Sequence, residues 1–260
     1  DLIVNVADEL EKLGIRDKSE SDTLKNFVVY SEYGTIWVVD SGLRAVSKYT
    51  VAISESTLKG VKILTSPYSF AKPVAIKNHI KYSPCYYVAD HDAGEIVQLN
   101  PQGKAEYTFT DIPNVIDLAV HYDTGTLWAV TVSSKEPRLV IYNTFTNSLI
   151  KSVKGLNQPT AITINQKRDD VWIADIGDTD RIILLNAEEF LADVSDTLTA
   201  ANAKFFDNGY LNNPGSIAIR NETEGTLYIA DTDDGQIEML SYDIDLGEYD
   251  RFDAPSKPND

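Results

Sequence analysis

Acidic side chains gather in three short segments of this sequence, and their spacing is the first feature that could support chemistry. The segments contain Asp90 and Asp92, then Asp175, Asp178 and Asp180, then Asp231, Asp233 and Asp234. Carboxylate oxygens are the ligands that Ca²⁺ prefers, and the ion takes roughly six to eight oxygens. The second and third segments are therefore candidate calcium sites, and the first choice is the set Asp175, Asp178 and Asp180.

A structural interpretation of these segments competes with calcium, and it is the one we favour. Short polar side chains in turns often accept backbone N–H bonds, so the leading Asp of each segment is expected to fix a hairpin. The segment DTDDGQIE (231–238) also lacks the sixth-position Gly and the twelfth-position Glu of a complete calcium loop. Calcium is thus the one cofactor that the sequence leaves open.

Zinc and nucleophilic chemistry find less support. The three histidines, His79, His91 and His121, are expected to be solvated loop residues on two opposite faces, so they do not converge as a zinc site requires. Cys85 has no basic neighbour in the sequence to lower its pKa, so we expect an inert, partly buried thiol.

The acidic segments belong to an internal repeat. Five stretches are variants of one phrase: GTIWVVDSG (34–42), CYYVADHDAG (85–94), GTLWAVTVS (125–133), DVWIADIGD (170–178) and GTLYIADTDDG (225–235). Alignment of Asp40, Asp90, Thr131, Asp175 and Asp231 gives successive spacings of 50, 41, 44 and 56 residues. This period is typical of a four-stranded propeller blade.

Each phrase has the same surroundings. An apolar strand precedes it, as in TAITI (160–164), and two more strands follow, as in RIILL (181–185) and KFFD (204–207). The phrase itself alternates aromatic and β-branched residues, which suits a buried second strand. The aromatic residues at equivalent places are expected to pack between blades, and they are Trp37, Tyr87, Trp128, Trp172 and Tyr228.

The fifth repeat, GTLYIADTDDGQIEML preceded by Pro214, resembles an NHL repeat. Pro73 and Pro159 stand similarly before the second and fourth phrases, and the resemblance covers residues 26–253. It implies an all-β fold, a β-propeller of four-stranded blades with five blades recognisable, or six if one is missing or shared. The third repeat departs from the pattern with Thr131 in place of Asp.

The resemblance leaves function open, because NHL proteins and their relatives include ligand binders, protein-interaction modules and enzymes. Metal-dependent sugar-lactone hydrolases and strictosidine synthase-like enzymes share the architecture and keep polar ligands near the axis. Asp117 is the one charged residue in an otherwise apolar innermost strand. It is a weak catalytic candidate as a metal ligand or general base, and it is equally a candidate acceptor of N–H groups from a neighbouring turn.

Segments outside the repeat complete the predicted organisation. Residues 1–25 form an N-terminal extension with a short helix, residues 26–254 the propeller, and residues 255–260 a C-terminal tail. A second helix is predicted at 187–202, because Phe190, Val194, Leu198 and Ala201 form one stripe and Asn186 with Glu189 supplies a cap. The exposed end blades or the extension are expected to support a homo-oligomer.

The net charge and the apolar pattern of the sequence limit the classes of partner that we expect. The formal net charge of −17 argues against nucleic acid, because binding it depends on cations. No apolar run approaches the roughly 20 residues that membrane insertion requires. Asn221 begins an Asn-Glu-Thr sequon in a predicted hairpin, which makes it a candidate glycosylation site and is compatible with an extracellular or extracytoplasmic location.

The sequence supports three hypotheses on function. The first is a non-enzymatic binding or assembly module that presents its hairpin turns to a protein or glycan, because the repeat is intact while every catalytic constellation is incomplete. The second is a calcium-assisted hydrolase or lyase with its site on the acidic face. The third is a subunit of an extracellular assembly.

Overall fold

The computed structural model describes residues 24–30, 35–54, 57–79, 84–133, 136–177, 179–206, 211–220, 225–243 and 248–253. Several predictions lie outside these residues: the N-terminal helix, Asp178, Asn221 and the C-terminal tail. In the part that is described, no helix is both long enough and apolar enough to span a bilayer.

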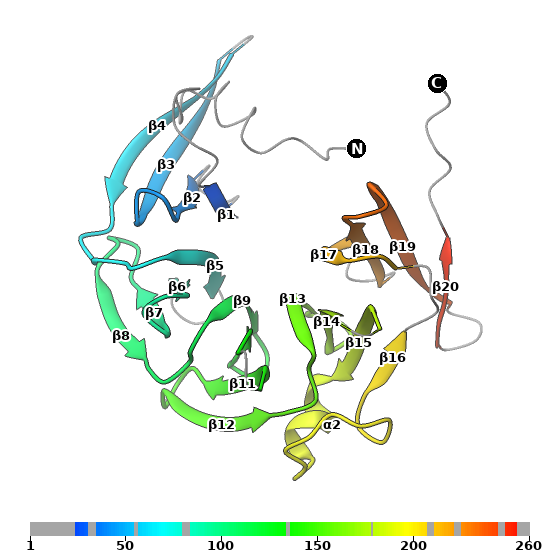
Figure 1. Cartoon of the computed structure of the whole chain (residues 1–260). Coiled ribbons are helices and arrows are strands. Elements are labelled where there is room, and N and C mark those ends of the chain that lie inside the picture. Colours follow the sequence, from blue (N-terminus) through cyan, green and yellow to red (C-terminus); the bar gives the residue numbers. More distant parts are fainter. Residues whose placement is uncertain are drawn as a thin grey trace. The chain divides into compact units, whose positions relative to one another are not determined.

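The described residues form five antiparallel sheets of four strands each (Figure 1). Sheet one contains β1 (Leu24–Tyr30), β2 (Thr35–Asp40), β3 (Ala45–Ser54) and β4 (Thr57–Thr65). Sheet two contains β5 (Pro73–His79), β6 (Cys85–Asp90), β7 (Glu95–Leu99) and β8 (Ala105–Phe109). Sheet three contains β9 (Val115–His121), β10 (Thr126–Thr131), β11 (Arg138–Asn143) and β12 (Ser148–Val153). Sheet four contains β13 (Gln158–Asn165), β14 (Asp170–Ile176), β15 (Arg181–Asn186) and β16 (Lys204–Phe206), and sheet five contains β17 (Pro214–Arg220), β18 (Thr226–Asp231), β19 (Gln236–Asp243) and β20 (Glu248–Asp253).

The chain divides into two compact units, Asp1–Val115 and Ile116–Asp260. The first contains sheets one and two, and the second contains sheets three to five apart from the first residue of β9. Within every sheet the strands pair in chain order, each with the next. The repeated phrase forms the second strand of each sheet, as predicted, and its aligned polar residue lies at or next to the end of that strand.

Alternation within the second strand explains how neighbouring sheets pack. Trp172 faces sheet five and packs in one cluster with Ile217 and Leu227. Residues of the opposite parity, such as Ile173, pack in a cluster with Trp128 of sheet three. Burying aromatic and branched side chains on both faces is the main stabilising contribution of such a sheet.

The tryptophans confirm the prediction of packing between sheets. Trp37, Trp128 and Trp172 are at most 1% exposed, and Tyr87 is also buried. Trp37 lies 4.5 Å from Tyr86 between ring centroids, which joins sheets one and two. Tyr228, at the equivalent place in sheet five, is half-buried.

The predicted helix at 187–202 is too long. Helix α2 spans Ala187–Ala192, and Asn186 caps it by accepting the Glu189 N–H at 3.1 Å. The helix ends because the Asp193 side chain accepts the Ser195 N–H at 3.1 Å, a local bond that competes with helical hydrogen bonding. Val194 is consequently 98% exposed, which contradicts the predicted apolar stripe.

Candidate functional site

The aspartates that end the second strands have a structural task, although not the one predicted. Asp90 is fully buried, and its two carboxylate oxygens accept the N–H groups of Ala71 at 2.7 Å and Lys72 at 2.6 Å. These two residues directly precede Pro73 and form what we call the lead-in dipeptide of the first strand. The carboxylate therefore anchors the start of β5 and does not fix its own hairpin, which corrects the interpretation drawn from the sequence.

Asp175 does the same in sheet four and adds a cation. It accepts the N–H groups of its lead-in dipeptide, Asn157 at 2.9 Å and Gln158 at 2.8 Å. The Arg181 guanidinium donates to Oδ2 through Nε at 2.9 Å and through Nη2 at 2.7 Å. Burial raises the pKa of Asp175, while Arg181 and the two N–H groups act in the opposite direction. All the carboxylate oxygens of this fully buried side chain are thus engaged within the protein.

In sheets one and three the aligned residue accepts N–H groups of its own hairpin. Asp40 accepts the N–H groups of Gly42 and Leu43 in its own turn, at 3.0 and 2.9 Å. Thr131 accepts the N–H of Arg138 across its hairpin at 3.1 Å. Asp40 and Thr131 thus accept N–H groups within their own hairpins, the role that the sequence analysis expected for the leading Asp of the three acidic segments.

Sheet five departs from both arrangements. Asp231 is 1% exposed, and its Oδ1 accepts the N–H of Asn212 at 3.0 Å. The second lead-in N–H, that of Asn213, turns instead to Asp180 Oδ2 at 2.6 Å, from the turn of sheet four. Oδ2 of Asp231 consequently has no hydrogen-bond partner among the residues that the structure describes.

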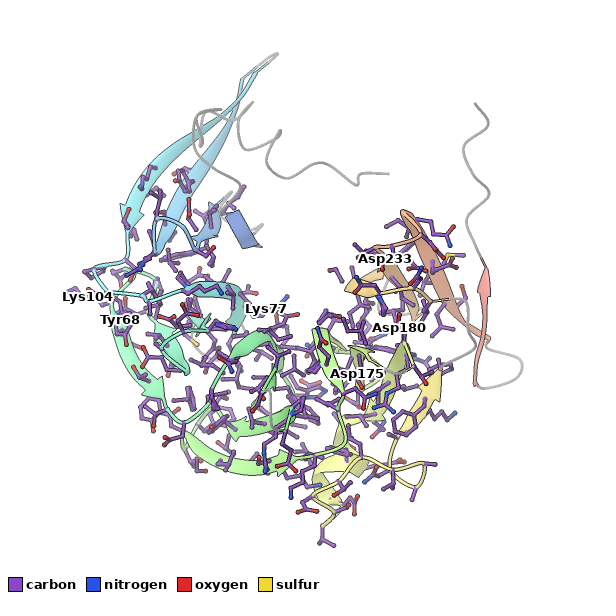
Figure 2. All side chains as sticks on the ribbon, viewed as in Figure 1. Tyr68, Lys77, Lys104, Asp175, Asp180 and Asp233 are labelled. Carbon is purple, nitrogen blue, oxygen red and sulfur yellow. The ribbon has the colours of Figure 1, made fainter. Side chains whose placement is uncertain are left out.

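The side-chain amides of this lead-in dipeptide, Asn212 and Asn213, donate hydrogen bonds to two further carboxylates. Asn212 Nδ2 donates to Asp234 at 3.1 Å, and Asn213 Nδ2 donates to Asp233 at 3.2 Å. Figure 2 labels Asp180 at sheet four and Asp233 in the turn of sheet five. We name this group the acidic seam, and it comprises Asp180, Asp231, Asp233, Asp234 and Glu238.

Glu238 is the member that the sequence analysis missed. It is 3% exposed, and it lies across from Ile229 on the face that carries Asp231. The equivalent residue in sheet four is Ile183, which lies across from Ile173 and is fully buried. Alignment of the third strands, RIILL with QIEML, contains the signal, because it places one carboxylate among apolar residues.

Two carboxyl groups of the seam have altered acidity. Burial raises the pKa of Asp231, and the charges of Asp234, Asp180 and Asp233 raise it further, against the Asn212 N–H. Burial likewise raises the pKa of Glu238, and Asp231 and Asp234 add to the effect. Each group therefore holds its proton more tightly in the folded chain than in the unfolded chain.

This acidity predicts a pH-dependent stability difference. A carboxyl group whose folded pKa is raised stabilises the fold below its unfolded pKa, and that stabilisation is lost as the pH rises through the folded value. Glu238→Gln keeps an oxygen that can accept the 2.7 Å bond from Gln236 Nε2 but cannot ionise. The variant should be more stable than the wild type at pH 7, and the difference should shrink as the pH falls toward 4.5, the ordinary value for Glu. Urea denaturation across this range measures it, and a difference that does not change with pH would contradict the assignment.

The residues predicted to bind calcium are now placed. Asp175 is taken up by N–H groups and Arg181, Asp178 lies outside the described residues, and Asp180 joins Asp231, Asp233 and Asp234 in the seam. In the described portion of the chain, no group of three or more His, Cys, Asp or Glu side chains is arranged to hold a metal ion. Calcium binding stays a prediction.

Asp117, the weak catalytic candidate, joins two innermost strands. Its Oδ1 accepts the N–H of Leu118 at 2.9 Å, and its Oδ2 accepts the N–H of Ile162 in β13 at 3.0 Å. This is the alternative role that the sequence allowed, with a neighbouring strand as the donor in place of a turn.

The histidine prediction is wrong for two of three residues. His79 and His121 are buried, and His121 Nε2 lies 2.9 Å from Asp169 Oδ1. His91 is more open and pairs with Asp92 at 2.6 Å. Cys85 is buried, and burial raises the pKa of its thiol, as an inert thiol requires.

A cavity of about 800 Å³ lies beside α2 and β15 in the second unit. Its lining includes Arg168, Asp170, Glu189, Asp193 and Lys204. Arg168 Nε pairs with Asp170 Oδ2 at 3.1 Å. The hydroxyl of Ser195 in this lining donates to the Thr197 carbonyl oxygen at 3.0 Å. Activation of a hydroxyl nucleophile needs a base that accepts its proton, so the acidic seam is the stronger candidate site.

Comparison with known proteins places the architecture. No protein-family model matches this sequence, and no curated protein matches it either. Solved structures do. A chain in a nidogen/laminin complex has a TM-score of 0.62 and 12% identity, covering 90% of this chain and 81% of its own. The WD40 repeats of RRP9 give a TM-score of 0.66 and 16% identity, covering 85% and 61%. The WD40 domain of Toxoplasma gondii coronin gives 0.68 and 13%, covering 90% and 59%.

WD40 repeats form propellers whose blades are four-stranded sheets. The fold is a β-propeller. At identities this low the similarity extends to the fold alone, and the chain spans about three fifths of the length of the two WD40 chains. The propeller places the turn after each second strand, and with it the acidic seam, at the end of a blade.

Proposed function

We propose that this chain is a non-enzymatic propeller of the NHL type, with five blades, that binds a protein partner through the turns after its second strands. The partner is expected to carry a basic surface, because the chain has a formal net charge of −17. The acidic seam is the expected centre of the contact.

One observation carries this proposal: the seam keeps negative charge that no Lys or Arg neutralises among the described ion pairs. The carboxylate of Asp90 accepts backbone N–H groups, and the carboxylate of Asp175 also accepts guanidinium N–H groups. In the seam, Asp233 and Asp234 are exposed, and none of the described ion pairs joins a Lys or Arg to its carboxylates. Uncompensated charge on an exposed turn favours encounter with a partner of opposite sign.

The solved structures support a protein partner in general terms. One contains a nidogen/laminin complex, which is an association between proteins, and two others are WD40 domains. A propeller presents many turns on a rigid scaffold, so residues can vary at the turns without disturbing the blades.

Charge-neutral variants of the turn test the proposal. Tagged chain immobilised on beads is used to capture proteins from extracts of the source organism, and captured proteins are then titrated individually. Asp233→Asn with Asp234→Asn should weaken the specific partner at least about tenfold, because the change removes two exposed charges but retains the amide oxygens. The expected affinity also falls with added salt.

The matched control is Glu188→Gln with Glu189→Gln in α2, which makes the same change in net charge at exposed residues of the same unit. This pair should leave partner affinity unchanged. Equal weakening by both pairs would indicate a nonspecific charge effect and would refute the turn as the binding surface.

Some expectations from the sequence stay predictions. They are a glycan as partner, assembly through end blades or the N-terminal extension, and an extracellular location marked by a glycan at Asn221. One observation bears on assembly: Tyr228, Ala230, Ile237 and Met239 on one face of sheet five are half-buried. Their counterparts Trp172, Ala174, Ile182 and Leu184 are buried.

A further inference from the structure

Each sheet is called a blade from here on, with the same number. Blades four and five have an aligned aspartate at the end of the second strand, but different residues lie opposite it. In blade four, Asp175 lies directly across the strand pair from Arg181. In blade five, Asp231 lies across from Gln236. Residues paired in this way share one face of the sheet, so Gln236 stands where the arginine stands in the neighbouring blade.

Blade four shows how an arginine satisfies this position. Arg181 Nε and Nη2 both reach Asp175 Oδ2, and Nη2 also donates to the carbonyl oxygen of Gly155 at 2.9 Å. Its guanidinium carbon lies 4.9 Å from the centre of the Phe205 ring. The planar, forked guanidinium suits this combination of carboxylate, carbonyl and aromatic contacts.

Blade five keeps the acceptors but lacks the cation. Oδ2 of the almost fully buried Asp231 has no partner in the described part of the chain. The side-chain amide of Gln236 donates to Glu238 Oε1 at 2.7 Å, and within the described residues it does not reach Asp231 Oδ2. Two residues therefore break the pattern of blade four on one face, a glutamine for an arginine and a glutamate for an isoleucine.

Both differences, Gln236 for Arg181 and Glu238 for Ile183, make this face more negative in blade five than in blade four. Buried negative charge lowers the stability of the fold unless a cation neutralises it. Natural proteins tolerate such local violations mainly at functional sites. The described carboxylates do not form a metal-binding group of three. A guanidinium needs no such group, because its five N–H donors spread over several acceptors.

The turn beside the site is exposed to solvent. The turn between β18 and β19 exposes Thr232, Asp233, Asp234 and Gly235. A Cβ added at Gly235 would meet no atom within 4 Å. An incoming side chain would pass the exposed carboxylates of Asp233 and Asp234 and would displace the half-buried Gln236 amide.

We propose that the acidic seam binds an arginine side chain of a protein partner, which takes the place at Asp231 and Glu238 that Arg181 takes at Asp175. The inference rests on the proposed function, because it specifies the chemistry of the partner at the same turn. It makes Asp231 and Glu238 the residues that determine specificity.

The test uses a short probe peptide, acetyl-Gly-Arg-Gly-amide, and its citrulline analogue, which has nearly the same shape but no charge. Titration of the full chain, followed by NMR chemical shifts or calorimetry, should give at least about tenfold tighter binding for the arginine peptide. Gln236→Arg supplies the guanidinium internally, so it should raise the melting temperature and weaken the arginine peptide about tenfold or more.

Gln102→Arg is the matched control, because it makes the same substitution at an exposed turn of blade two. It should leave both the melting temperature and the peptide affinity unchanged. Equal binding of the two peptides, or affinity for the arginine peptide that survives Gln236→Arg, would overturn the inference. If Gln236→Arg does not fold, Glu238→Gln serves instead and should also weaken the arginine peptide.

Two further outcomes distinguish the arginine site from the proposed function alone and from a metal site. Partner capture that still depends on Asp233 and Asp234, without selective binding of the arginine peptide, would refute the guanidinium site and leave the proposed function standing. Millimolar CaCl₂ that raises the melting temperature of the wild type but not of Gln236→Arg would assign the seam to a metal ion and overturn the inference.

Discussion

Asp175→Ala is expected to lower the free energy of unfolding by about 3–5 kcal/mol. The substitution removes the acceptor of two lead-in N–H groups and leaves Arg181 beside a site without its counter-charge. The side chain is fully buried, so water does not replace the lost contacts without rearrangement. Urea denaturation followed by circular dichroism measures the change.

Thr131→Ala is the control for Asp175→Ala, since Thr131 occupies the equivalent place in blade three but accepts one N–H within its own hairpin. Its loss should be about 1 kcal/mol, the value of one ordinary hydrogen bond. Losses of equal size in the two variants would show that the buried carboxylate does not anchor the lead-in dipeptide.

Exchange of Glu238 and its counterpart Ile183 should change stability in opposite directions. Ile183→Glu places an uncompensated carboxylate at a fully buried position and should destabilise the fold by at least about 3 kcal/mol. Glu238→Ile removes a buried carboxylate and restores the apolar residue of blade four, so it should stabilise the fold by about 1 kcal/mol or more. Both are measured by urea denaturation at pH 7.

The Glu238→Ile variant also distinguishes a role of Glu238 in stability from a role in binding. Glu238→Ile should be more stable than the wild type and bind the arginine peptide more weakly, a trade that is common where a site is kept at the expense of the fold. A Glu238→Ile chain that is less stable than the wild type would mean that the glutamate supports the blade, and its role as a binding residue would lose its basis.

The strand pattern was accessible from the sequence because it is repeated. Each phrase alternates residues that face the two neighbouring blades, and the same alternation in five copies leaves little freedom for other arrangements. The sequence alone therefore assigns Trp37 and Trp172 to packing between blades. The NHL resemblance predicted the propeller, and the solved structures support that fold.

The direction of the aspartate bonds was not accessible in the same way. Asp90 and its donors Ala71 and Lys72 are separated by 18 or 19 residues, so a view of the turn alone favours the nearer N–H groups. His121 was misplaced for the same reason, because its partner Asp169 lies 48 residues away in the chain. Contacts made between distant segments depend on the three-dimensional arrangement and leave no local signal.

Glu238 is an intermediate case. The third strands of blades four and five differ by one carboxylate in an apolar run, and comparing them position by position identifies it.

The prediction of a helix at 187–202 was too long because of a local effect. The side chain of Asp193 ends the helix by accepting the N–H of Ser195, two residues further along the chain. Such competition between side chain and backbone is visible in a sequence only as a tendency.

Amide hydrogen exchange of the chain, with and without its captured partner, tests the central claim most directly. The account predicts that the partner protects amides of residues 232–236 and of the lead-in dipeptide Asn212 and Asn213, with little change in α2. Protection confined to other blades or to α2, with the turn of blade five exchanging as in the free chain, would contradict it.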